Sequence, residues 1–236
     1  MNLSFAWNED YLIPVIAILS STILFLIYHF TGWSANVDEK FRQDESRLRI
    51  VMFRRVLGAG SFGLIPLLLI LIFYNGKYSD FGLSFIHFHQ SLLWVVVLGF
   101  LIIPMNYFAA RKPTNLEQYP QIRKKEWTGG LIITSALSWI AYLTGYEFMF
   151  RGWLLFGTAI YTGTWPAIAI NTAIYSLVHV PKGLNEAIGA IPLGIILCIA
   201  TVSTGTIWVA LLTHILLALS NEWFSIKYHP EMSFTP

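Results

Sequence analysis

Seven long apolar runs constrain this chain more than any other feature of its sequence. A helix needs about 20 mostly apolar residues to cross a bilayer. The runs cover residues 11–30, 56–74, 91–109, 128–162, 165–180, 186–203 and 207–226. The fourth run has 35 residues, too many for one straight span, and Gly145 is its candidate break. The pattern predicts an all-α, polytopic membrane protein with about seven transmembrane helices.

The composition supports this class and excludes others. Hydrophobic residues make up 56% of the chain and charged residues 12%, whereas soluble domains carry about 25% charged residues. The Lys and Arg residues lie in connections and form no stripe with interleaved aromatics, so we expect the lipid bilayer and not a nucleic acid as a partner. No soluble domain or internal repeat is evident, and we expect a single membrane domain over 1–236.

The basic residues are unevenly distributed between the connections. They concentrate at residues 31–50 and 110–127 and are nearly absent from the N-terminus and from 75–90. Cytoplasmic loops carry the excess of Lys and Arg in membrane proteins. We therefore expect the N-terminus outside and the two basic connections in the cytoplasm.

The two halves of the chain differ in the ionisable residues inside their apolar runs. The first three runs hold almost none, and Gly58, Gly60 and Gly63 in the second would allow close helix contact. Ionisable groups at membrane depth are costly, face the protein interior and mark functional sites. We therefore expect residues 1–127 to form a scaffold and residues 128–226 to form the site, with these candidate residues: Glu147, Arg151, His179, Glu186, His214 and Asn221.

These side chains are the parts of a peptide hydrolase that uses activated water. Glu147 and Arg151 are four apart, so they share a helix face and can pair. A carboxylate near a histidine can activate a water as general base. A second histidine or an amide can donate to the developing oxyanion, and an arginine can hold the carboxylate in place.

Other interpretations of the same residues stay open. Glu147 and Arg151 can form a purely structural ion pair, and a histidine near a span end is often an interfacial residue. His179, His214 and Glu147 could bind Zn²⁺, since two histidines and a carboxylate form a catalytic ligand set. No HExxH pattern is present, so we rank zinc below a site without a cofactor. A small transporter with a proton relay is a further alternative, although no paired repeat halves are evident.

Three motifs in the back half resemble the CPBP family of intramembrane proteases, also described as CAAX proteases and bacteriocin-processing or self-immunity proteins. That family carries Glu-Glu-x-x-x-Arg, then an aromatic-x-x-x-His, then His-x-x-x-Asn on successive membrane helices. This chain has Tyr146-Glu147 followed by Arg151-Gly152, then Tyr175 through His179, then His214. The resemblance covers about 128–226. It implies an integral protein of the bacterial inner (plasma) membrane that cleaves a peptide bond of a peptide or membrane-protein substrate near the membrane surface.

The chain departs from the family pattern at two positions, as a divergent branch with Tyr-Glu in place of Glu-Glu. Tyr146 stands where the family has its first glutamate, and Ala218 where it has the asparagine. One interpretation is a shifted site, in which Glu186 and His179 activate the water, Glu147 with Arg151 orients the site, and His214 with Asn221 stabilises the oxyanion. The alternative is a catalytically inactive scaffold or immunity protein that binds a peptide partner in the same cavity.

Overall fold

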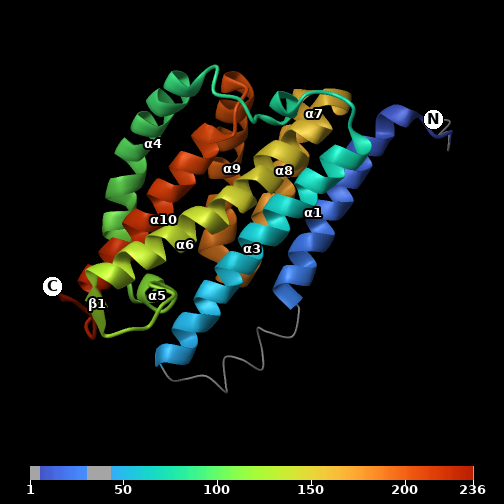
Figure 1. Ribbon diagram of the computed structural model, residues 1–236. Helices are drawn as coiled ribbons and strands as arrows, with labels where there is room; N and C mark the ends of the chain where they lie inside the picture. Colours follow the sequence, from blue (N-terminus) through green and yellow to red (C-terminus); the bar gives the residue numbers. More distant parts are fainter. Residues whose placement is uncertain (1–5, 31–43, 236) are drawn as a thin grey trace.

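The computed structural model describes residues 6–30 and 44–235, and each of the seven predicted runs is helical in it. Most of the first predicted basic connection, 31–43, lies outside the described residues. The all-α membrane class is confirmed. The main helices pack side by side (Figure 1) and have these bounds: α1 (Leu12–Phe30), α3 (Asp44–Phe73), α4 (Phe88–Ala109), α6 (Gly129–Glu147), α8 (Thr164–Leu177), α9 (Leu184–Thr204) and α10 (Trp208–Tyr228).

Short elements connect these helices. Single turns lie at η1 (Glu9–Tyr11), η2 (Tyr78–Phe81), α5 (Pro113–Leu116) and η4 (Val180–Lys182). Strand β1 (Glu126–Thr128) pairs in parallel with β2 (Ser233–Thr235), with Trp127 opposite Phe234. This small sheet joins the segment after α10 to the start of α6 (Figure 1).

Five helices in the described chain are long and apolar enough to cross a membrane. They cover Glu9–Phe30, Arg47–Phe73, Phe88–Ala109, Leu184–Thr204 and Trp208–Tyr228. The fourth and fifth predicted runs are helical without meeting this criterion. Helix α8 has 14 residues, about 21 Å at 1.5 Å per residue, which is less than a hydrocarbon core of about 30 Å.

The predicted break at Gly145 is wrong. Gly145 lies inside α6, and the chain stays helical beyond Glu147 as a π-helix, η3 (Phe148–Phe156), followed by α7 (Gly157–Thr162). The wider turns of a π-helix are frequent at functional sites. Gly163, with φ +84°, separates α7 from α8 because glycine adopts this backbone conformation without a steric cost.

Gly145 has a packing role instead. A Cβ at this position would lie 2.6 Å from the Ala59 carbonyl oxygen of α3, so only glycine lets the two backbones approach this closely. Gly63 faces the same crossing, since its Cβ would lie 3.6 Å from the Gly145 Cα. The expected close contact is therefore confirmed for Gly63, whereas Gly60 has nothing within 4 Å.

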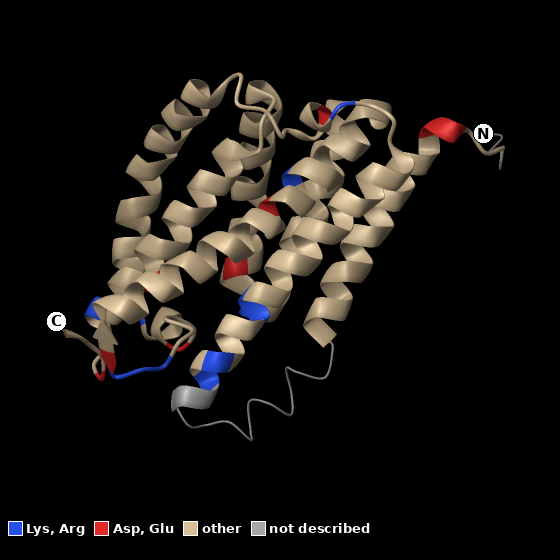
Figure 2. Ribbon diagram, viewed as in Figure 1, with Lys and Arg blue, Asp and Glu red and all other residues tan. Residues whose placement is uncertain are grey.

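The outer surfaces of the front helices are apolar and the charges gather at the helix ends. Leu64 of α3 and Phe100 of α4 are 62% and 77% exposed, as expected for side chains that face lipid. Basic residues colour the α4–α6 connection and the beginning of α3 at one end of the bundle (Figure 2). The direction in which this end faces stays a prediction.

Candidate active site

The candidate site forms where the end of α6 and the π-helix η3 meet α8 and α10. Glu147 is the last residue of α6 and Arg151 lies in η3. Both side chains are fully buried, because α3 packs against α6 at Gly145 and aromatic side chains cover η3. Buried charges must be paired, so the contacts of this carboxylate define the site.

The Glu147 carboxylate contacts two cationic or basic groups from different elements. Its Oε2 lies 3.7 Å from Arg151 Nε, which confirms the predicted pair. Its Oε1 lies 2.6 Å from His214 Nδ1 of α10. An ionised carboxylate only accepts hydrogen bonds, so the His214 Nδ1–H donates. The carboxylate therefore links η3 to α10 and orients the His214 ring.

Four buried polar atoms around this carboxylate have no hydrogen-bond partner in the described protein. They are Glu147 Oε2 and the three guanidinium nitrogens of Arg151. The guanidinium carbon also lies 4.4 Å from the centre of the Tyr175 ring, and this cation–π contact provides no hydrogen-bond acceptor for the guanidinium N–H groups. Buried polar groups are normally hydrogen-bonded to protein or ordered water. The pair therefore has hydrogen-bonding capacity for water or a substrate group.

His179 follows α8 and lies on the other side of the same aromatic cluster. Its Nδ1–H donates to the Tyr175 carbonyl oxygen at 2.7 Å, and the centres of the His179 and Tyr175 rings lie 4.6 Å apart. The Tyr146 ring packs next to two others: its centre lies 6.3 Å from the centre of the Tyr175 ring and 5.6 Å from the centre of the His214 ring. The Arg151 guanidinium packs over the same Tyr175 ring. The structure thus brings both histidines and the buried pair into one cluster.

The two histidines present the same ring nitrogen. Each uses Nδ1 to donate to an oxygen, and within the described chain neither Nε2 forms a hydrogen bond to protein. The His179 side chain is 8% exposed and the His214 side chain 12% exposed. A histidine held through Nδ1 in this way has its Nε2 free for proton transfer.

Glu186 is placed elsewhere. Its carboxylate accepts a hydrogen bond from the Tyr119 hydroxyl at 3.1 Å and lies 3.6 Å from Lys182 Nζ. Gln118, which directly precedes Tyr119 in the chain, donates to the Lys182 carbonyl oxygen at 2.8 Å. These contacts tie the α4–α6 connection to the turn before α9, and in the described chain no hydrogen bond joins Glu186 to His179.

Asn221 is buried in α10, and its Oδ1 has no partner in the described protein. It lies seven residues beyond His214 in one continuous helix, about 10.5 Å further along the axis. At that separation the two side chains cannot donate to the same oxygen. The structure therefore does not bring Asn221 to His214.

Possible metal ligands are the next feature of the site. Among the described residues, no group of three or more His, Cys, Asp or Glu side chains is spaced to hold a metal ion. His179, which would be the third ligand beside His214 and Glu147, faces the Tyr175 carbonyl and ring.

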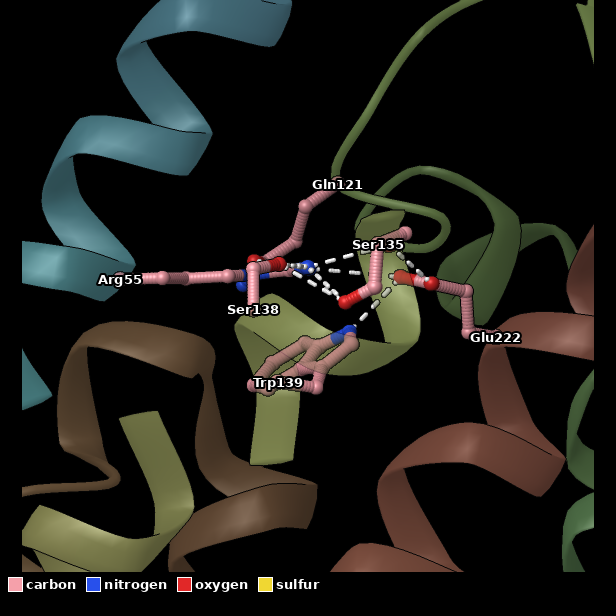
Figure 3. A network of polar contacts seen from close by, with 6 residues as sticks. All are labelled: Arg55, Gln121, Ser135, Ser138, Trp139 and Glu222. Carbon is pink, nitrogen blue, oxygen red and sulfur yellow. Dashed lines mark hydrogen bonds and ion pairs between the residues drawn. The ribbon is translucent and has the colours of Figure 1, made fainter. Parts of the chain in front are cut away.

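A second buried ion pair was missed in the sequence. Arg55 of α3 and Glu222 of α10 lie 3.3 Å apart and are 3% and 1% exposed (Figure 3). Glu222 lies within the predicted run 207–226, so the rule that singled out Glu147 would have found it. Arg55 immediately precedes the predicted run 56–74, whereas α3 already begins at Asp44.

The comparisons with known proteins cover part of the chain. No curated protein and no solved structure matches it. One family model, described as type II CAAX prenyl endopeptidase Rce1-like, matches residues 127–220. These 94 of 236 residues include Glu147, Arg151, His179 and His214, whereas Asn221 lies just beyond them. The segment that carries the buried cluster is therefore similar to a family of membrane-associated peptidases.

Proposed function

We propose that this chain is an intramembrane endopeptidase that hydrolyses a peptide bond with a water activated by its own side chains. The observation that carries the proposal is the hydrogen bond of 2.6 Å between His214 and Glu147 inside the segment similar to CAAX endopeptidases. Because oriented histidines with a free Nε2 serve as general acids and bases, the cluster has the groups that such a hydrolysis needs.

His179 is the proposed base. Its Nδ1–H donates to the Tyr175 carbonyl, so the neutral ring has an unshared electron pair on Nε2. This nitrogen takes a proton from water while the water oxygen bonds to the substrate carbonyl carbon. The same proton then passes to the departing amine as the peptide C–N bond breaks, which leaves a carboxylic acid and an amine.

His214 is the proposed oxyanion donor. In the proposed scheme His214 acts as an imidazolium whose Nδ1–H donates to Glu147, and its Nε2–H donates to the oxygen that becomes negative. With Arg151 on the other carboxylate oxygen, the three groups carry a net positive charge next to that oxygen. Glu147 and Arg151 position the donor and do not touch the water in this scheme.

The proposed proton transfer does not use Glu186, whose carboxylate contacts Tyr119 and Lys182. Asn221 likewise has no role in this scheme. The proposal requires no cofactor; zinc on His179, His214 and Glu147 is the competing assignment. The proposed substrate is a peptide or membrane protein, and the proposed location is the bacterial inner membrane with the N-terminus outside.

The test is quantitative mass spectrometry of membrane-protein termini in cells with wild-type protein, with His179→Ala and with Glu186→Gln. New termini should depend on His179 and survive in Glu186→Gln, because loss of a general base costs about 10²–10⁴ in rate. Purified protein then cleaves an identified substrate after dialysis against a chelator, unless zinc is required. If the termini disappear in Glu186→Gln and persist in His179→Ala, the assigned roles are wrong.

A second function is favoured by one observation. Tyr146, with 4% exposure, puts a phenol ring where the CPBP pattern has a carboxylate, and the ring packs between His214 and Tyr175. The second candidate function is therefore that of an inactive protein that binds a peptide partner without cleaving it. Cells with the wild-type protein, with His179→Ala and with Glu186→Gln would then show identical termini. In that case a crosslinkable analogue placed at His179 should capture the bound partner.

A further inference from the structure

Helices α6 and α10 contact each other through a second polar site besides Glu147 and His214. The Trp139 Nε1–H donates to Glu222 Oε2 at 2.8 Å, and the Ser135 hydroxyl donates to Glu222 Oε1 at 2.5 Å (Figure 3). Both donors belong to α6, and the acceptor belongs to α10. One carboxylate of α10 is thus held by two side chains of the same neighbouring helix.

The two contacts between α6 and α10 are equally spaced along both helices. Trp139 precedes Glu147 by eight residues, and Glu222 follows His214 by eight residues. The helices therefore run antiparallel in a fixed register, and each pair of contacts spans about 12 Å of helix. Leu143 of α6 and Ala218 of α10, which lie between the two contacts along their helices, belong to one apolar cluster.

Arg55 extends this second contact to α3. Its Nη1 donates to the Ser138 hydroxyl at 2.9 Å and its Nη2 to the Gln121 side-chain oxygen at 3.1 Å, while its guanidinium carbon lies 3.9 Å from the centre of the Trp139 ring. The ion pair joins Arg55 directly to Glu222 and does not use the donors on α6. The register contact can therefore be weakened without leaving a buried carboxylate without a cation.

We propose that Glu222 is a positioning residue, which Ser135 and Trp139 hold so that α10 presents His214 to Glu147. A slide of α10 by one residue moves His214 by 1.5 Å along the axis and turns it by about 100°. A hydrogen bond of 2.6 Å does not survive such a shift. The carboxylate of Glu222 thus acts on the candidate site through the helix, at a distance from it. The inference concerns the geometry of His214 and rests on the proposed function only for its activity readout.

The test replaces both donors on α6. Trp139→Phe keeps the ring over Arg55 but removes the N–H, and Ser135→Ala removes the hydroxyl. The matched control is Trp208→Phe, which removes a Trp N–H of α10 that donates to the Ser84 carbonyl oxygen at 2.9 Å and not to α6. Ser135→Thr, which keeps the hydroxyl, serves as the conservative variant.

The readout is the Nδ1–H resonance of His214 in nitrogen-15-labelled full-length protein in lipid nanodiscs, assigned by its loss in His214→Gln. The double variant Ser135→Ala/Trp139→Phe should shift or broaden this resonance, whereas Trp208→Phe and Ser135→Thr should keep it unchanged. If the double variant keeps the wild-type resonance, or if the control changes it equally, the positioning role is wrong.

Activity separates this inference from the proposed function. If the chain cleaves peptides, the double variant should lower kcat by about tenfold, with KM unchanged. This loss is smaller than the about 10²–10⁴ expected when a catalytic base is removed outright, because the donor is displaced and not deleted. If neither the wild type nor any variant cleaves a peptide, and the double variant still shifts the His214 resonance, the positioning role holds and the endopeptidase proposal fails. A double variant that raises KM alone, with the resonance intact, contradicts the positioning role.

Discussion

His214 Nδ1 and Glu147 Oε1 lie 2.6 Å apart, although the two residues are separated by 67 positions in the sequence. The contact crosses from α6 to α10 two residues beyond Gly145, where the backbone of α3 packs closely against α6. Because the carboxylate also faces Arg151, it divides its two oxygens between an imidazole and a guanidinium. The geometry of this one side chain therefore controls both the charge and the orientation of the cluster.

The replacement of Arg151 by alanine should destabilise the protein. It would leave Glu147 buried without its guanidinium, and breaking a buried pair on one side costs about 3–5 kcal/mol. The combined replacement Glu147→Met/Arg151→Met should recover most of this free energy of unfolding but no activity. SDS titration of purified protein in mixed micelles measures both effects. If the combined variant is as unstable as Arg151→Ala, the pair is not the cause of the loss.

The close crossing of α3 and α6 makes Gly145 intolerant of a methyl group. Gly145→Ala would place a Cβ 2.6 Å from the Ala59 carbonyl oxygen, which must force the helices apart. Overpacking of this kind lowers the free energy of unfolding by about 1–3 kcal/mol. SDS titration of the purified variant measures this loss. Gly60→Ala is the matched control, because nothing lies within 4 Å of its added Cβ. Equal losses in the two variants would show that the helix crossing is looser than described.

The orientation predicted from the basic connections can be measured with two new cysteines. Lys77→Cys lies in the connection between α3 and α4, and Lys112→Cys in the connection between α4 and α6; both positions are exposed. In whole cells an impermeant maleimide should label Lys77→Cys and spare Lys112→Cys until the membrane is opened. The native Cys198 is buried and serves as an unreactive background. The reverse labelling pattern would put the N-terminus inside.

His229 should make stability depend on pH. Burial lowers the pKa of this histidine, the Arg123 guanidinium lowers it further, and Glu231 opposes them. The neutral ring also accepts a hydrogen bond from the Glu231 backbone N–H at 3.2 Å. The native state thus binds the His229 proton less tightly than the unfolded chain does. The contribution of the neutral ring to the free energy of unfolding is therefore complete above the ordinary histidine pKa of about 6.5 and is lost as pH falls below it. His229→Gln should flatten the dependence of unfolding free energy on pH between 7 and 5, whereas an unchanged slope would contradict the assignment.

The lengths of the apolar runs were enough to predict the helices, because a helix needs a minimum apolar length to cross a bilayer. The Glu147–Arg151 pair could also be predicted, since four residues place two side chains on one helix face. The partners of Glu186 could not, because Tyr119 lies in a loop whose path across the end of α9 depends on tertiary packing. The role of Gly145 could not be predicted either. It permits the close approach of α3 and does not break the helix, and the presence of a glycine in the sequence does not distinguish these two roles.

The order in which the chain is made gives the long-range ion pairs a further consequence. Arg55 is synthesised 167 residues before Glu222, and Glu147 67 residues before His214. Arg55 therefore reaches the membrane before its carboxylate partner on α10 exists, whereas Glu147 already has Arg151 four residues further on and lacks only His214. Ionisable groups at membrane depth are costly, so both helices depend on partners that arrive later. Insertion of α10 thus completes two buried sites at once: it brings a carboxylate to Arg55 of α3 and an imidazole to Glu147 of α6.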